Sequence, residues 1–161
     1  MSIFNDIVEQ IKLSLSQCST LADVKFIDTG REEVVPNPIN NVYVSLGISS
    51  IEINEGSFGA FLGLTSVGEQ YGNTSEIDIE MKIFSPRQSG SKMCYDVFSK
   101  IYEELLYHAK NYNVKCIACK KAKYNDDIFS FELECHLKLN AYLGYQTEDI
   151  NISNIQIEKK M

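Results

Sequence analysis

The stretch FSFELECHLKL, residues 129–139, alternates apolar and polar side chains without interruption. Successive side chains of a β-strand point to opposite faces of the sheet, so this alternation predicts a strand over residues 129–143 with one buried and one solvated face. The segment SEIDIEMKIF, residues 75–84, repeats the pattern, with isoleucine and methionine on one parity and mostly charged residues on the other. Two such strands predict a sheet that has one covered face and one open face.

Two other segments have the apolar spacing of helices that would cover such a sheet. Residues 3–15 and 93–105 carry apolar side chains at every third or fourth position, which gathers them along one side of an α-helix. Further strands are expected at residues 24–28, 41–54 and 114–123. This order of elements predicts an α+β fold, a two-layer sandwich with two helices on one face of a mostly antiparallel sheet of about four to five strands.

The composition is that of a globular domain without affinity for polyanions. The chain has 161 residues, of which 44% are hydrophobic and 23% are charged. Its formal net charge of −7 disfavours specific binding to nucleic acid or to an anionic membrane. We expect no signal peptide, because Asp6 and Glu9 interrupt the first apolar segment, and no run of apolar residues reaches the length of a membrane span. We expect a single domain over residues 1–145 and a C-terminal extension over residues 146–161.

The segment NEGSFGAFLGLTSVGEQYGN, residues 54–73, combines five glycines with large apolar side chains. Two interpretations stay open: a hairpin that folds back on its own core, or a protruding arm that packs against a neighbouring subunit, because exposed apolar groups form an adhesive patch. The polar extension also carries isoleucines that leave it partly apolar and that would suit a neighbour. The candidate subunit-interface residues are Phe58, Phe61, Leu62, Leu64 and Val67 in the arm and Ile152, Ile155 and Ile157 in the extension.

Two charged groups of residues are candidates for contacts with other molecules. Glu76, Asp78 and Glu80 share one strand face, which is either a solvated surface or, if the protein forms a ring, the wall of a lumen that repels a polyanion. Four lysines lie around the strand expected at residues 114–123, where they either protect a sheet edge or contact an acidic partner. These lysines are Lys115, Lys120, Lys121 and Lys123.

The candidates for catalysis or metal binding are few. Cys116 and Cys119 have a CxxC spacing, but residues i and i+3 of a strand point to opposite faces, so the two thiols would diverge. The five cysteines are an odd number with irregular spacing, which favours reduced thiols in a cytoplasm. His108 and His136 are the only histidines, and neither is accompanied by an evident nucleophile. We therefore expect no catalytic residues, no metal and no cofactor, and we expect that the protein is not an enzyme.

The order of these segments resembles that of the tail terminator, or collar, family of tailed bacteriophages and contractile R-type bacteriocins. The resemblance rests on a leading helix, the strand VYVSLGISSIEI (42–53), the glycine-rich arm, the strand EIDIEMKIFSP (76–86) followed directly by a helix, and a final hairpin that ends in LNAYLGY (139–145). It extends over most of the chain, and its motifs have low specificity.

The resemblance implies a structural subunit without catalytic residues. Such a subunit forms a ring, usually a homohexamer, that caps the head-proximal end of the tail tube and ends its polymerisation. It implies contacts with copies of itself, with the tube protein and with sheath or neck proteins, after assembly in the bacterial cytoplasm. Three alternatives stay open: a small-molecule-binding or regulatory domain with residues 58–67 as a lid, another virion part such as a head–tail connector, and an enzyme that uses Cys116, Cys119 or His136.

Overall fold

The structure is a computed structural model of the chain. It describes residues 3–29, 39–55, 61–66, 68–108 and 112–144. The chain divides into two compact units: the first comprises Met1–Glu52 and Glu76–Ala141, and the second comprises Ile53–Ser75 and Tyr142–Met161. The division into a domain over residues 1–145 and an extension stays a prediction, because residues 145–161 lie outside the described part.

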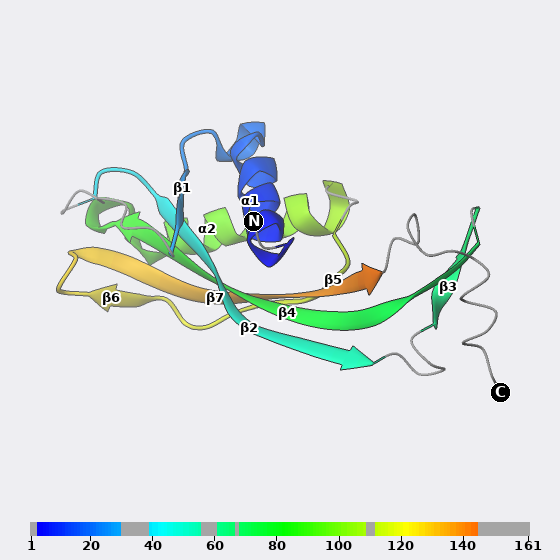
Figure 1. The fold of residues 1–161 in the computed structure, drawn as a ribbon. Coiled ribbons are helices and arrows are strands. Elements are labelled where there is room, and N and C mark those ends of the chain that lie inside the picture. The colour runs from blue at the N-terminus through cyan, green and yellow to red at the C-terminus, as the bar shows by residue number, and fades with distance from the viewer. Residues whose placement is uncertain (1–2, 30–38, 56–60, 67, 109–111, 145–161) are drawn as a thin grey trace. The chain divides into compact units, whose positions relative to one another are not determined.

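Within the described residues, seven strands form one sheet, and five of them follow the order β1-β2-β4-β7-β5 (Figure 1). The strands are β1 (Lys25–Asp28), β2 (Tyr43–Glu55), β3 (Phe61–Thr65), β4 (Gly68–Pro86), β5 (Val114–Cys119), β6 (Lys123–Asn125) and β7 (Ser130–Gly144). β1 runs parallel to β2, whereas β3 is antiparallel to β4, and β5 and β6 are antiparallel to β7. The expected α+β fold is confirmed. The one strand expected at residues 114–123 is divided into β5 and β6.

Two α-helices in the described residues lie on the same side of the sheet (Figure 1). They are α1 (Ile3–Ser16) and α2 (Gly90–Glu103), and α2 continues into a π-helical turn at Glu104–His108. Short 3-10 turns lie at Ser19–Leu21 and Arg87–Ser89. The hydroxyl of Ser85 at the end of β4 donates to the carbonyl of Gly90, 3.1 Å away, which fixes the start of α2 against the strand. Neither α-helix is long and apolar enough to cross a membrane.

The core of the first unit lies between the helices and the sheet. Every second residue from Ile77 to Ile83 of β4 and from Phe131 to Ala141 of β7 points into it, as the alternation predicts, and the apolar stripes of α1 and α2 cover this face. Burying one aliphatic side chain of this size contributes about 1.5–3 kcal/mol, so this layer is the main source of stability. Its most buried members include Ile77, Ile79, Met81 and Ile83 of β4, Leu133, Leu137 and Leu139 of β7, and Ile11, Leu15, Val97, Ile101 and Leu105 of the helical layer.

Phe129 departs from the pattern that predicted the strand. The sequence places it on the buried parity of the strand at residues 129–143, but β7 begins at Ser130 and the Phe129 side chain is 53% exposed. Its backbone has a φ of 51°, in the left-handed region that non-glycine residues seldom adopt. Phe129 therefore belongs to the turn between β6 and β7, and the expectation that it continues the buried face is wrong.

Candidate functional site

The open face of the sheet in the first unit carries a dense set of charged side chains. These side chains alternate with the buried residues of β4 and β7, so they point away from the helices. Lysines from the neighbouring edge reach across to them. We call this set the charge ladder: Glu76, Asp78, Glu80 and Lys82 of β4, Glu132, Glu134, His136 and Lys138 of β7, and Lys115 and Lys120 from the edge.

At one end of the ladder, Glu76 and Asp78 of β4 pair with nitrogens of β7 or β5. Glu76 forms a hydrogen-bonded ion pair with Lys115, and its other oxygen lies 3.6 Å from Nζ of Lys138. Oδ1 of Asp78 lies 3.2 Å from Nδ1 of His136. Moving along β4 from Glu76 to Asp78 moves backwards along β7 from Lys138 to His136, which is the order of antiparallel strands.

The ladder continues along β7 to the β6 hairpin. Nε2 of His136 lies 3.4 Å from Oε1 of Glu134, and the same oxygen lies 2.7 Å from Nζ of Lys120. Nζ of Lys82 lies 3.6 Å from Glu80 and 3.9 Å from Glu132. Five carboxylates thus face four ammonium groups and one imidazole, so this face carries little net charge.

The pairs shift the acid–base equilibria of their members in the direction that keeps both charged. The hydrogen bond from Lys115 lowers the pKa of the Glu76 carboxyl below its ordinary 4.5, and the hydrogen bond from Lys120 does the same for the pKa of Glu134. The partner carboxylates raise the pKa of Lys115 and of Lys120 above 10.5. At neutral pH these pairs are therefore fully ionised.

The candidate lumen-facing residues Glu76, Asp78 and Glu80 lie together on this open face, as the alternation predicts. Each has a nitrogen of a basic side chain within 3.6 Å, so they do not form an uncompensated acidic surface within one subunit. Exposed ion pairs contribute about 0–1 kcal/mol each, so the ladder adds little to the stability of the fold. The lumen-facing role itself stays a prediction.

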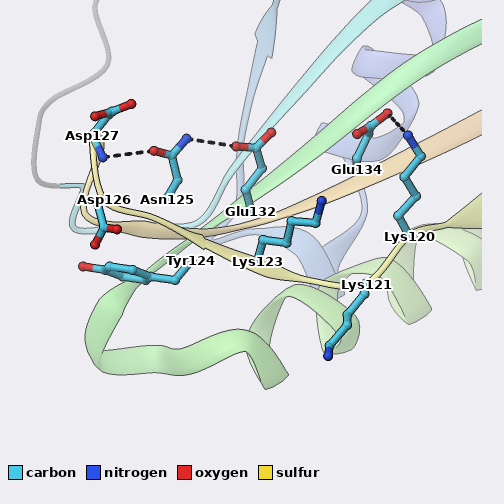
Figure 2. Close-up of a pocket in the computed structure, with 9 residues that line it drawn as sticks. All are labelled: Lys120, Lys121, Lys123, Tyr124, Asn125, Asp126, Asp127, Glu132 and Glu134. Carbon is cyan, nitrogen blue, oxygen red and sulfur yellow. Dashed lines mark hydrogen bonds and ion pairs between the residues drawn. The ribbon is translucent and has the colours of Figure 1, made fainter.

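The four candidate partner-contact lysines separate into two groups. Lys115 and Lys120 fold onto the open face and belong to the ladder, whereas Lys121, just before β6, and Lys123, its first residue, are exposed. Lys120, Lys121 and Lys123 line a cleft of about 410 Å³, together with Tyr124, Asn125, Asp126, Asp127, Glu132 and Glu134 (Figure 2).

The cleft is lined mainly by charged and polar residues, and some of their side chains hold one another in place. The Asn125 amide donates to Glu132 at 3.2 Å and accepts from the backbone N–H of Asp127 at 3.0 Å, as Figure 2 shows. The ring of Tyr124 contacts that of Phe131 edge-on, with 5.1 Å between the centroids. Both amines and carboxylates line the cleft, which suits a charged segment of another protein better than an apolar ligand.

The two cysteines of the CxxC sequence lie on opposite faces of β5. Cys116 is opposite Lys138, which points to the open face, whereas Cys119 is opposite the buried Cys135. The predicted divergence of the thiols is therefore confirmed. Among the residues that the structure describes, no group of three or more His, Cys, Asp and Glu side chains is arranged to hold a metal ion.

The histidines occupy different surroundings. Both ring nitrogens of His136 face carboxylates, so neither contacts a hydroxyl or a thiol that it could activate as a nucleophile. His108 is exposed at the end of the π-helical turn.

The glycine-rich arm contains a β-hairpin in the second unit. β3 and the start of β4 pair from Phe61 opposite Tyr71 to Thr65 opposite Gly68. Leu64 is 76% exposed on this hairpin. Phe61 and Leu62 also lie on β3, whereas Phe58, Val67, Ile152, Ile155 and Ile157 lie outside the described residues. The structure thus supports a hairpin, and its role as a subunit interface stays a prediction.

No family model matches the sequence, and no curated protein matches it. Among solved structures, the chain is similar to a chain of the virion of a native gene transfer agent (GTA) particle, with a TM-score of 0.53 and 13% sequence identity. The similarity covers 82% of this chain and 91% of that chain. The two chains therefore share a fold over most of their lengths.

Proposed function

We propose that this protein is a non-enzymatic structural subunit of a phage tail or phage-tail-like particle. In this proposal, copies of the chain form a ring, a homohexamer, that caps the head-proximal end of the tail tube and ends its polymerisation. The observation that carries the proposal is the fold shared with a virion chain over 82% of this chain and 91% of the other. The resemblance of the segment order to the tail terminator family supports the specific role.

The β3–β4 hairpin is the surface that would join neighbouring copies. Leu64 is 76% exposed in a single chain, and an apolar side chain of this size gains about 1.5–3 kcal/mol when it is fully buried. In the proposed ring the hairpin of one copy packs on the next, and the other apolar residues of the arm and the extension contribute to the same contacts.

The remaining surfaces suit contacts with other proteins of the particle. Lys121 and Lys123 are exposed residues that line the cleft, and they would contact the tube protein or a sheath or neck protein through complementary charge. Glu76, Asp78 and Glu80 would line the lumen. Assembly takes place in the bacterial cytoplasm, and the mature location is the virion or tail-like particle.

The geometry of the candidate catalytic groups supports a non-enzymatic role. Cys116 and Cys119 point to opposite faces of β5, and His136 lies between two carboxylates. A nucleophile needs a base within hydrogen-bond distance, and these three residues do not provide such a pair.

Two measurements test the proposal. Light scattering should detect an oligomer of the purified chain, alone or with the tube protein, and electron microscopy should show that this oligomer is a closed ring that ends the growth of polymerising tubes. Leu64→Asp should deplete the ring, whereas Leu13→Asp, which changes a leucine of α1 that is 58% exposed, should leave it intact. A chain that stays monomeric at high concentration and with tube protein contradicts the ring. A ring that leaves tube length unchanged contradicts the terminator role and favours a head–tail connector.

A further inference from the structure

Cys119 and Cys135 lie directly opposite each other on neighbouring antiparallel strands. The register of β5 and β7 places Cys119 across from Cys135 and Ile117 across from Leu137. Cys135 and Leu137 are fully buried in the core, so Cys119 points to the same side of the sheet as Cys135. Cys119 is nevertheless exposed, because β5 is the last strand of the path.

The hydrogen bonds between the strands determine how close the two residues come. The backbone N–H of Lys120 donates to the carbonyl of Glu134 at 2.9 Å, so Lys120 and Glu134 form the hydrogen-bonded type of pair. Because the two types alternate along an antiparallel ladder, Cys119 and Cys135 form the non-hydrogen-bonded type, in which the Cα atoms are about 4.5 Å apart. Disulfides need Cα atoms roughly 4.4–6.8 Å apart, so the strands already hold the two cysteines within bonding reach.

We propose that Cys119 and Cys135 are a site of oxidative modification, at which hydrogen peroxide joins β5 to β7 through a cross-strand disulfide. The thiolate of the exposed Cys119 attacks peroxide, the O–O bond breaks, and a sulfenic acid and hydroxide form, the hydroxide becoming water with the thiol proton. The sulfur of Cys135 then attacks the sulfenic sulfur, the S–S bond forms, the S–O bond breaks, and the leaving hydroxide takes the Cys135 proton. Two thiols lose two electrons and two protons, and one peroxide becomes two waters.

The surroundings determine which thiol reacts first. Burial raises the pKa of the Cys135 thiol, so Cys135 carries little thiolate at neutral pH and is reached by peroxide only through the core. Cys119 is exposed and is the group that meets the oxidant. Cys94 also lies in this part of the core, with its thiol 3.8 Å from the carbonyls of Ile83 and Phe131, and it is the competing partner for Cys135.

The disulfide would link the edge strand β5 covalently to β7. It closes a short loop through the β6 hairpin, and a loop of this length raises the melting temperature of a chain of this size by roughly 6–12 °C. If the proposed function holds, the particle leaves a reducing cytoplasm and the disulfide would form after release. The chemistry of the cysteine pair does not depend on that function.

Peptide mapping of the oxidised chain tests the site. Trypsin leaves Cys116 and Cys119 on one peptide, CIACK at residues 116–120, so the Cys116→Ser variant is used as the parent. After treatment of the folded, reduced protein with hydrogen peroxide, we expect a non-reduced species that joins residues 116–120 to residues 124–138, a higher melting temperature, and reversal of both by dithiothreitol. Cys119→Ser in the same parent should abolish the linked peptide and the thermal shift.

The results of the peptide mapping distinguish the Cys119–Cys135 disulfide from other oxidation products. A linked peptide that joins Cys94 to Cys135, or a chain in which Cys119 becomes sulfinic acid without any cross-link, overturns the proposal. A cross-link that also forms at equal yield in unfolded protein overturns it as well, because register would then play no part. Ring assembly is measured separately on the reduced protein, so a failure of the disulfide leaves the proposed function untouched and a failure of the ring leaves the disulfide untouched.

Discussion

Gly47 of β2 lies against Thr29, the residue that follows β1. A Cβ atom at Gly47 would lie 1.8 Å from Oγ1 and 3.1 Å from Cβ of Thr29. Thr29 is held there by two hydrogen bonds to the carbonyl of Leu46, from its backbone N–H at 3.0 Å and from its hydroxyl at 3.2 Å. The side chain of Thr29 thus occupies the volume that any larger residue at Gly47 would need.

We expect Gly47→Ala to lower the free energy of unfolding by about 1–3 kcal/mol, because the new methyl group displaces Thr29 and breaks the hydrogen bond from its hydroxyl to Leu46. Thr29→Ala alone should cost about 1 kcal/mol through the lost hydrogen bond. The double variant should lose less than the two single losses added together, since removing Oγ1 makes room for the methyl group. Urea denaturation of the four proteins measures this coupling, and strictly additive losses would refute the close contact.

Phe129 is a residue whose burial the alternation pattern predicts wrongly. Its alternation with Phe131, Leu133 and Cys135 is what a strand requires, and from Leu133 onwards the pattern predicts burial correctly. The Asn125-Asp126-Asp127 turn lies just upstream, and the turn ends with Phe129 in the left-handed region instead of the strand. Periodicity cannot distinguish the last residue of a turn from the first residue of a strand, because both satisfy the same spacing.

At the scale of the elements, the sequence predicts which face of a strand a side chain occupies, but not which residue of the next strand lies beside it. Alternation places Asp78 and His136 on polar faces of their strands, yet nothing local relates two residues that are separated by the whole of α2, β5 and β6. Register decides that His136 lies against Asp78 and that Cys119 lies against Cys135, and register depends on long-range packing. The charge ladder and the cysteine pair therefore could not be read from spacing alone.

The ladder gives the fold a dependence on pH whose sign follows from the shifted carboxyl groups. The pKa of Glu76 is lowered in the folded chain, so its contribution is present above the unfolded value of 4.5 and is lost as pH falls through the lower folded value. Glu76→Gln should therefore destabilise the protein more at pH 7 than at pH 3. Denaturant titrations at both pH values measure the difference.

An exposed carboxylate outside the ladder is the control for this effect. Asp96→Asn removes one such group from α2 and is measured at the same two pH values for comparison. High salt should shrink the Glu76→Gln effect at pH 7, because exposed pairs are screened. An effect of Glu76→Gln that grows towards acid pH would contradict the assigned pairing with Lys115.

For the first unit as a whole, stability depends on the layer between helices and sheet, not on the charged face. Ile101 of α2 is fully buried in this layer, and Ile101→Ala should lower the free energy of unfolding by about 2–5 kcal/mol. Leu13→Ala, at the leucine of α1 that is 58% exposed, should change it by about 0.5 kcal/mol or less. Guanidinium denaturation compares the two, and equal losses would mean that α2 does not cover the sheet in solution.

For the molecule as a whole, we expect folding and assembly to depend on different residues. Every buried apolar side chain among the described residues lies between Val8 and Leu139, so a chain that ends at Gly144 retains this whole core. We expect this truncated chain to keep the melting temperature of the full chain to within a few degrees. If the isoleucines Ile152, Ile155 and Ile157 bind a neighbouring copy, as the proposed ring requires, the same truncation should lower the fraction of rings at a given concentration.

Two readouts on the truncated chain distinguish these contributions. Differential scanning calorimetry on dilute protein reports the fold, and mass photometry across a concentration series reports the ring. A melting temperature that falls by more than about 10 °C, which corresponds to several kcal/mol in a chain of this size, would show that the last residues belong to the domain. If neither the melting temperature nor the fraction of rings changes, the extension is not part of the interface. The β3–β4 hairpin, with Leu64 at its surface, would then be the contact that holds the copies together.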